Sequence, residues 1–106
     1  MGKYMIQFSY TGEGVKGLLK EGGTKRREVV EQLVKGLGGK VEAMYWSFGE
    51  HDGIVIVDAP DNTRVAAASL AVSASGAARI QTTVLLTAEE VDQVAKITVN
   101  YRPPSG

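Results

Sequence analysis

The sequence predicts an α+β fold in which helices cover one face of a four-stranded antiparallel sheet. Four segments have the alternating or β-branched pattern of strands, and glycine, proline or capping residues separate them from amphipathic segments. The order is strand, helix, strand, strand, helix, strand, helix. A chain of 106 residues that is 43% apolar and 23% charged fits one domain, residues 1–106.

The first strand and helix follow from the spacing of apolar residues. Large apolar side chains alternate with smaller or polar ones over residues 4–10, as in a strand with one buried face. The glycine-rich segment 11–23 predicts a loop with at most one helical turn, over residues 15–20, placed to cover a pocket. Thr24 is the expected N-cap of a helix that ends at Gly38-Gly39. Its apolar stripe is Val29, Val30, Leu33, Val34 and Leu37.

The second and third strands, residues 40–48 and 54–57, have little polar character on either face. Strands with two apolar faces are usually covered on both sides. One face is therefore expected to pack on the chain's own helices, and the other to meet a second subunit or a ligand. Strict alternation assigns the second strand's side chains to two sets: Val41, Ala43, Tyr45 and Ser47 on one face, and Glu42, Met44, Trp46 and Phe48 on the other.

The second half of the chain repeats the pattern. Pro60-Asp61-Asn62 begins an alanine-rich helix over residues 63–74, and a fourth strand follows over 79–86. Thr87-Ala88-Glu89-Glu90 is a capping box that opens a last helix, and the prolines of residues 99–104 require an extended tail. This order is the split βαβ, ferredoxin-like arrangement. Two such sheets paired face to face would form a dimeric α+β barrel; the alternative is a monomer with a wet sheet face.

Composition narrows the classes of partner. Twelve basic and twelve acidic residues leave no net charge, so no nucleic acid and no membrane is expected as a partner. The chain has no cysteine, which excludes disulfides and thiol catalysis. With one imidazole and no thiolate, no metal and no cofactor is expected. The first residues lack a signal-peptide pattern, and a cytoplasmic location is expected.

The turn between the second and third strands holds the only histidine, His51, next to Asp52. An imidazole titrates near pH ~6.5, so His51 is the candidate general acid or base, with Asp52 beside it. The alternative is that His51 only packs and makes one hydrogen bond. Since successive side chains of extended backbone point to opposite faces, Asp52 is expected to be a poor orienter of His51 and more apt to bind backbone N–H groups.

Two further groups are candidate ligand-binding residues. Lys25, Arg26 and Arg27 oppose the helix dipole in the first helical turn, which a bound phosphate or carboxylate would resolve. The alternative is that they are solvated charges or form ion pairs with Glu89 and Glu90 of another subunit. Trp46 and its neighbours would line a cavity for a flat molecule or pack in an interface. That aromatic set is Met44, Tyr45, Trp46 and Phe48, and its polar companions are Gln7, Ser9, Gln81 and Thr83.

Several motifs together resemble the GYD-domain family. They are Tyr4 to Tyr10 with Thr11, Arg26-Arg27, Leu37-Gly38-Gly39-Lys40, Phe48-Gly49-Glu50-His51-Asp52, Ala59-Pro60-Asp61, Gly76-Ala77-Ala78-Arg79, Thr82-Thr83 and Leu86-Thr87-Ala88-Glu89-Glu90. The resemblance implies a ferredoxin-like fold of the dimeric α+β barrel kind and no assigned biochemical role. The family's Gly-x-Tyr-Asp motif falls on residues 49–52, where His51 replaces the tyrosine but keeps an aromatic hydrogen-bonding ring.

Two functions fit these residues. The first is a homo-oligomeric protein, a homodimer or larger, that binds a small anionic or aromatic ligand in a cavity at the sheet face or an interface. The second is a cofactor-free enzyme of the isomerase, lyase or monooxygenase type, with His51 as acid or base and Arg26, Arg27 or Arg79 holding an anion. The enzyme requires His51 to line a concave pocket beside a basic group.

Overall fold

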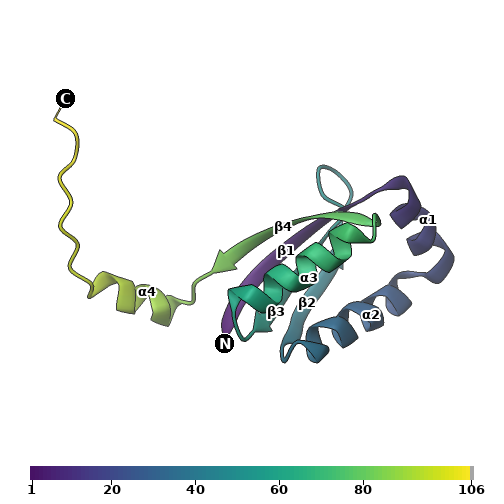
Figure 1. Cartoon of the computed structure of the whole chain (residues 1–106), viewed down its shortest axis with the longest axis horizontal. Helices are drawn as coiled ribbons and strands as arrows, with labels where there is room; N and C mark the ends of the chain where they lie inside the picture. The colour runs from purple at the N-terminus through teal and green to yellow at the C-terminus, as the bar shows by residue number, and fades with distance from the viewer. Residues whose placement is uncertain (106) are drawn as a thin grey trace.

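The computed structural model describes residues 1–105 and shows an α+β, ferredoxin-like fold, as the sequence predicts. Its four strands form one antiparallel sheet in the order β2-β3-β1-β4 (Figure 1). The elements are β1 (Gly2–Tyr10), α1 (Gly12–Glu21), α2 (Gly23–Gly36), β2 (Lys40–Trp46), β3 (Gly53–Ala59), α3 (Asn62–Ala74), β4 (Ala78–Leu85) and α4 (Ala88–Ala95).

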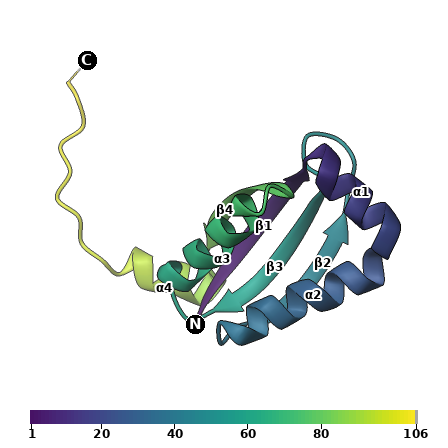
Figure 2. The ribbon, with the colours of Figure 1, turned by 45° about the vertical axis from the view of Figure 1, so that its right-hand side comes forward.

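The core lies between the sheet and two helices on the same face. Helix α2 packs over β2, whereas α3 packs over β3 and β4 (Figure 2). Every second residue of β3 is buried, so one face of the strand belongs to the core and the other is partly exposed. The buried set is Tyr4, Phe8, Val34, Val55, Val57, Ala59, Val65 and Ala78. Within residues 1–105 no helix packs on the opposite face of the sheet, and we call it the open face.

Residues 12–21, expected as a loop with one helical turn, form the ten-residue helix α1. The Thr11 side chain caps it by accepting from Gly14 N–H at 3.2 Å. Gly14 lies against the chain that leads into β4, and a Cβ there would come within 2.0 Å of the Ala77 carbonyl oxygen. Gly14 thus permits the close packing of α1 on this segment, and the helix continues through it.

The expected N-cap at Thr24 is also wrong. Gly22 adopts φ 85°, which ends α1, and α2 begins directly at Gly23 with Gly22 as its N-cap residue. Thr24 therefore lies inside the first turn of α2. A side chain at Gly22 would be strained, because L residues rarely adopt this backbone conformation.

A β-bulge in β2 overturns the strict alternation expected for this strand. The register with β3 shifts between Val41 and Ala43, so that Met44 pairs with Val55. Val41, Met44 and Trp46 consequently share the helix-covered face and pack on the core. Ala43 and Tyr45 lie on the open face, and the strand ends at Trp46 rather than at residue 48.

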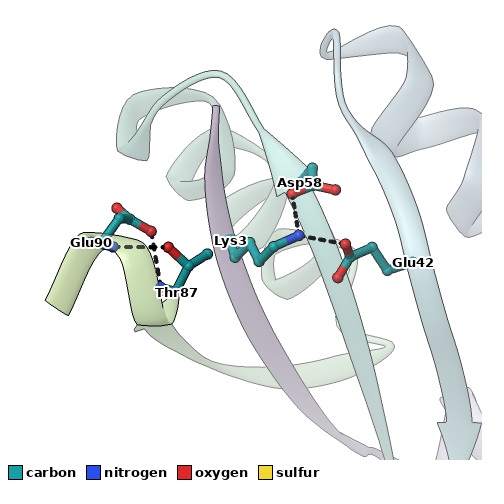
Figure 3. A network of polar contacts seen from close by, with 5 residues as sticks. All are labelled: Lys3, Glu42, Asp58, Thr87 and Glu90. Atoms are coloured by element: carbon teal, nitrogen blue, oxygen red, sulfur yellow. Dashed lines mark hydrogen bonds and ion pairs between the residues drawn. The ribbon is translucent and has the colours of Figure 1, made fainter. Parts of the chain in front are cut away.

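A charged cluster ties three strands together on the open face. Lys3 Nζ of β1 donates to Asp58 Oδ1 of β3 at 2.9 Å and also to Glu42 of the bulge (Figure 3). The hydrogen bonds to Glu42 and then Asp58 raise the pKa of Lys3. The bond from Lys3 in turn lowers the pKa of Asp58. The cluster fixes the bulged strand to the centre of the sheet.

The last helix stands apart from the sheet and the other helices. The expected capping box is present, with Thr87 Oγ1 accepting from Glu90 N–H at 3.1 Å and Glu90 Oε1 accepting from Thr87 N–H at 3.0 Å (Figure 3). Residues 86–105, which we call the C-terminal arm, project away from the sheet (Figure 1). All residues of α4 are exposed. No helix within residues 1–105 has the length and apolar character needed to cross a membrane.

Candidate functional site

The turn between β2 and β3, residues 47–52, is held in place by backbone hydrogen bonds. Ser47 N–H donates to Asp52 O at 2.8 Å, and Asp52 N–H donates to Phe8 O at 2.8 Å. Ser47 Oγ donates to His51 O at 2.9 Å and closes the turn. His51 is therefore fixed beside the end of β1, although it belongs to a loop.

The imidazole of His51 meets the hydroxyl of Ser9. Ser9 Oγ lies 3.3 Å from His51 Nδ1 and 3.2 Å from Glu50 O, to which it donates. A hydroxyl has one hydrogen, so the Ser9 oxygen then accepts from Nδ1–H. This tautomer leaves Nε2 of a neutral His51 as a proton acceptor.

A hollow of about 390 Å³ opens beside this pair. Its lining consists of Ser9, Glu50, His51, Arg79, Ile80 and Gln81. In the sheet register Ser9 pairs with Arg79 and Gln7 pairs with Gln81, so the side chains of Ser9, Arg79 and Gln81 lie on the open face. The structure thus brings His51 and a cation to one concave surface, which is the arrangement that the enzyme hypothesis requires.

The guanidinium of Arg79 has no counter-ion among the residues that the structure describes. It takes part in none of the ion pairs formed among residues 1–105. Glu50 lies on the wall of the hollow but is not within ion-pair distance of Arg79. An unpaired arginine can accept a carboxylate or phosphate through two parallel hydrogen bonds.

Asp52 does not orient His51. Its Oδ2 accepts from the backbone N–H of Tyr10 at 2.7 Å, and it lines no part of the hollow. The expectation that Asp52 binds a backbone N–H is confirmed, although the N–H belongs to β1 rather than to the turn itself. Asp52 extends the contact between the loop and β1, which is a structural role.

The cations of α2 are remote from this hollow. Arg26 Nη1 lies 3.5 Å from Glu21 Oε1, and Arg27 Nε lies 3.7 Å from Glu31 Oε1. Neither these arginines nor Lys25 lines the hollow. Arg26 instead lines a separate cavity on the helix-covered face. Among the expected anion-holding residues, Arg79 is therefore the one that shares a site with His51.

Trp46 also lies away from the hollow. Its Nε1–H donates to the Tyr10 hydroxyl at 3.1 Å, and its ring lies 3.6 Å from where a Cβ on Gly23 would stand. It packs between α2 and the sheet, on the face opposite the hollow. The bulge in β2, which no single-residue pattern reveals, is the reason. Sequence reasoning also missed the contact between Ser9 and His51; strand alternation placed Ser9 on the correct face, but only the register shows its partner.

The described residues do not form a metal-binding cluster. Residues 1–105 contain no group of three or more histidine or carboxylate side chains arranged to hold an ion. The polar atoms around the hollow are those of one imidazole, one guanidinium, one carboxylate, an amide and a hydroxyl. This set suits hydrogen bonding and charge pairing with an organic anion.

The fold and the hollow define a ferredoxin-like α+β protein with an uncovered, partly polar sheet face. The GYD domain family model matches residues 4–95, so the chain belongs to the GYD-domain family. No curated protein and no solved structure matches the chain significantly.

Proposed function

We propose that this GYD-domain protein is a small cytoplasmic homo-oligomer that binds a small anionic molecule, with a polar or aromatic body, in the hollow around His51 and Arg79. The observation that carries the proposal is that the only imidazole and an unpaired guanidinium line the same concave surface. Arg79 would hold the anionic group, while Gln81 and the imidazole would fix its orientation.

The open face supports the association of two copies. Its centre carries apolar side chains, among them Met5, Tyr45, Ile54 and Ile56, and Tyr45 is 68% exposed. Sheets pack about 10 Å apart, so a second sheet would bury this centre and cover the hollow at its margin. Covering would exclude water and strengthen the pairing of Arg79 with an anion. This arrangement is the dimeric α+β barrel.

Titration of the protein with benzoate, an aromatic carboxylate, and separately with inorganic phosphate tests the proposal. The imidazole signals in the NMR spectrum come from His51 alone, so they report binding without further assignment. We expect the signals to shift with benzoate, and Arg79→Gln to weaken binding by roughly tenfold or more, as loss of a charged hydrogen bond does. The matched control Arg64→Gln, on α3, should leave the affinity unchanged. Equal affinities of wild type and Arg79→Gln would refute the site.

The second candidate is a cofactor-free enzyme of the isomerase, lyase or monooxygenase type that uses His51 as acid or base. The contact of Ser9 with Nδ1 favours it, because it directs Nε2 to act as the proton acceptor. The simplest reaction is proton abstraction next to a keto group, with Arg79 holding the carboxylate. Deuterium uptake by phenylpyruvate in D2O, followed by NMR, should then be faster with wild type than with His51→Gln. Equal rates for the two proteins would exclude this reaction.

A further inference from the structure

A second cavity lies between α2 and α3, on the helix-covered face. It has a volume of about 240 Å³, and its walls are almost entirely apolar. Val29, Val30 and Leu33 of α2 form one wall, and Ala68 and Val72 of α3 form the other. We call this cavity the apolar groove. Val29 and Leu33 are more than a third exposed, so the groove is an uncovered part of the hydrophobic core.

Helix α4 has an apolar stripe that no other part of residues 1–105 covers. Val91 and Val94 are about half exposed, at 50% and 53%, and Ile97 just beyond the helix is 65% exposed. An isolated helix of eight residues is marginal in water, even with a capping box, and most helices owe their stability to packing of an apolar face. Eight residues span about 12 Å at 1.5 Å per residue. The longer α2 wall can accommodate that length.

The charges on α4 and at the groove are complementary. The first turns of α4 carry Glu89, Glu90 and Asp92, none of which takes part in an ion pair among residues 1–105. The first turn of α2 contains no acidic residue, and it carries Lys25 and Arg26. Arg26 lines the apolar groove itself and pairs with Glu21 at 3.5 Å, whereas Lys25 takes part in no ion pair among residues 1–105. An apolar stripe flanked by carboxylates therefore matches an apolar groove flanked by cations.

We infer that α4 of one copy docks in the apolar groove of a second copy, and that the second copy returns its own α4 in the same way. Only Leu86 and Thr87 connect α4 to β4, and the C-terminal arm leads away from the chain's own helices (Figure 1). Helix α3 packs over β4, and it lies between α4 and α2, the helix that forms the far wall of the groove (Figure 1). When two copies exchange their α4 helices reciprocally, the assembly is a closed dimer with two-fold symmetry.

This interface is distinct from the open sheet face. The groove lies on the helix-covered face, so a copy could exchange its arm and pair its sheet at the same time. Two different two-fold interfaces on one chain close into a tetramer when their axes cross at right angles. The inference does not depend on the hollow around His51, because the arm contributes no residue to it and Ile80 is the one residue that lines both the hollow and the groove.

Cysteine cross-linking tests the inference directly, since the chain has no cysteine of its own. In Leu33→Cys/Val94→Cys, mild oxidation should join two chains, as seen by a doubled mass on a non-reducing gel. Leu33→Cys/Gln93→Cys is the matched control, because Gln93 lies on the other side of α4, and it should cross-link much less. Ile54→Cys/Val94→Cys reports docking on the open face instead.

Each outcome decides between the alternatives. An interchain link in the 33/94 variant alone supports the exchange. Three other outcomes overturn the inference. An intrachain link in the 33/94 variant would show that the arm covers the groove of its own chain. A link only in the 54/94 variant would place the arm on the open face, and no link in either variant would show that the arm does not occupy the groove. As a second measurement, Val94→Asp, whose site is outside the core, should lower the oligomer mass in light scattering. An unchanged mass would also overturn it.

Discussion

Replacing Gly53 by alanine should destabilise the protein more than any other single methyl group added to its sheet. The ring of Phe8 packs directly over Gly53, and a Cβ there would lie 2.1 Å from Phe8 Cζ and 2.6 Å from Cε2. Both distances are far inside van der Waals contact, so the ring has to move. Phe8 is 6% exposed and packs edge-on against Tyr10 with ring centroids 5.2 Å apart.

The expected cost follows from overpacking of a dense core. Forcing an extra carbon into a well-packed site costs about 1–3 kcal/mol, and losing the aromatic pair adds about 0.5–1.5 kcal/mol. For a chain of this size each kcal/mol lowers the melting temperature by about 4 °C, so the combined cost of about 1.5–4.5 kcal/mol predicts a fall of roughly 6–18 °C. Circular dichroism at a fixed protein concentration measures it.

Two further variants make this prediction specific. Gly17→Ala, on α1, meets no atom within 4 Å and should leave stability unchanged or raise it by about 0.4–1 kcal/mol. The double variant Gly53→Ala/Phe8→Leu should be less destabilised than the sum of its single changes, because the smaller side chain makes room. A Gly53→Ala protein as stable as wild type, or additive costs in the double variant, would refute the packing argument.

Two more predictions concern the cluster at Lys3 and the single tryptophan. The pKa of Asp58 is lowered below its ordinary value of 3.8, so its contribution to stability is complete above pH 3.8 and is lost as the pH falls through the folded-state pKa. Asp58→Asn should therefore lose less stability than wild type when the pH is lowered, as measured by urea unfolding between pH 2 and 6. In a Lys3→Met background, the Asp58→Asn change should no longer alter the pH dependence. Parallel curves of unfolding free energy against pH for wild type and Asp58→Asn would contradict the role of the cluster. Trp46→Phe removes the hydrogen bond to the Tyr10 hydroxyl and should cost about 0.5–1.5 kcal/mol in urea unfolding, whereas no loss would show that this bond contributes nothing.

The fold was predictable because local patterns agree with it. Alternation over residues 4–10 marks β1, the Thr87 capping box marks α4, and Asp61, which accepts from Arg64 N–H at 2.9 Å, marks the start of α3. Where prediction fails, tertiary contact overrides a local rule. Residues 11–21 look too rich in glycine for a helix, yet Gly14 is needed where α1 meets Ala77.

The candidate site was predictable only in part. The turn with His51 was identified from composition, and alternation placed Arg79 and Gln81 on the open face. Their meeting depends on the pairing of β1 with β4, which joins segments about seventy residues apart and leaves no local signal. The face of Trp46 depends on one inserted residue in β2, because a shift of one residue reverses every later side chain of a strand.

The position of β1 in the sheet has a consequence for how the chain folds during synthesis. β1 is a central strand, and both of its neighbours, β3 and β4, come later in the chain. Tyr10 pairs with Ala78, so one edge of β1 has no partner strand until most of the chain has left the ribosome. During that interval β1 presents unpaired backbone groups and the aromatic rings of Tyr4 and Phe8. Translation at about 5–20 residues per second sets that interval at several seconds, during which β1 is open to wrong pairing with other nascent chains.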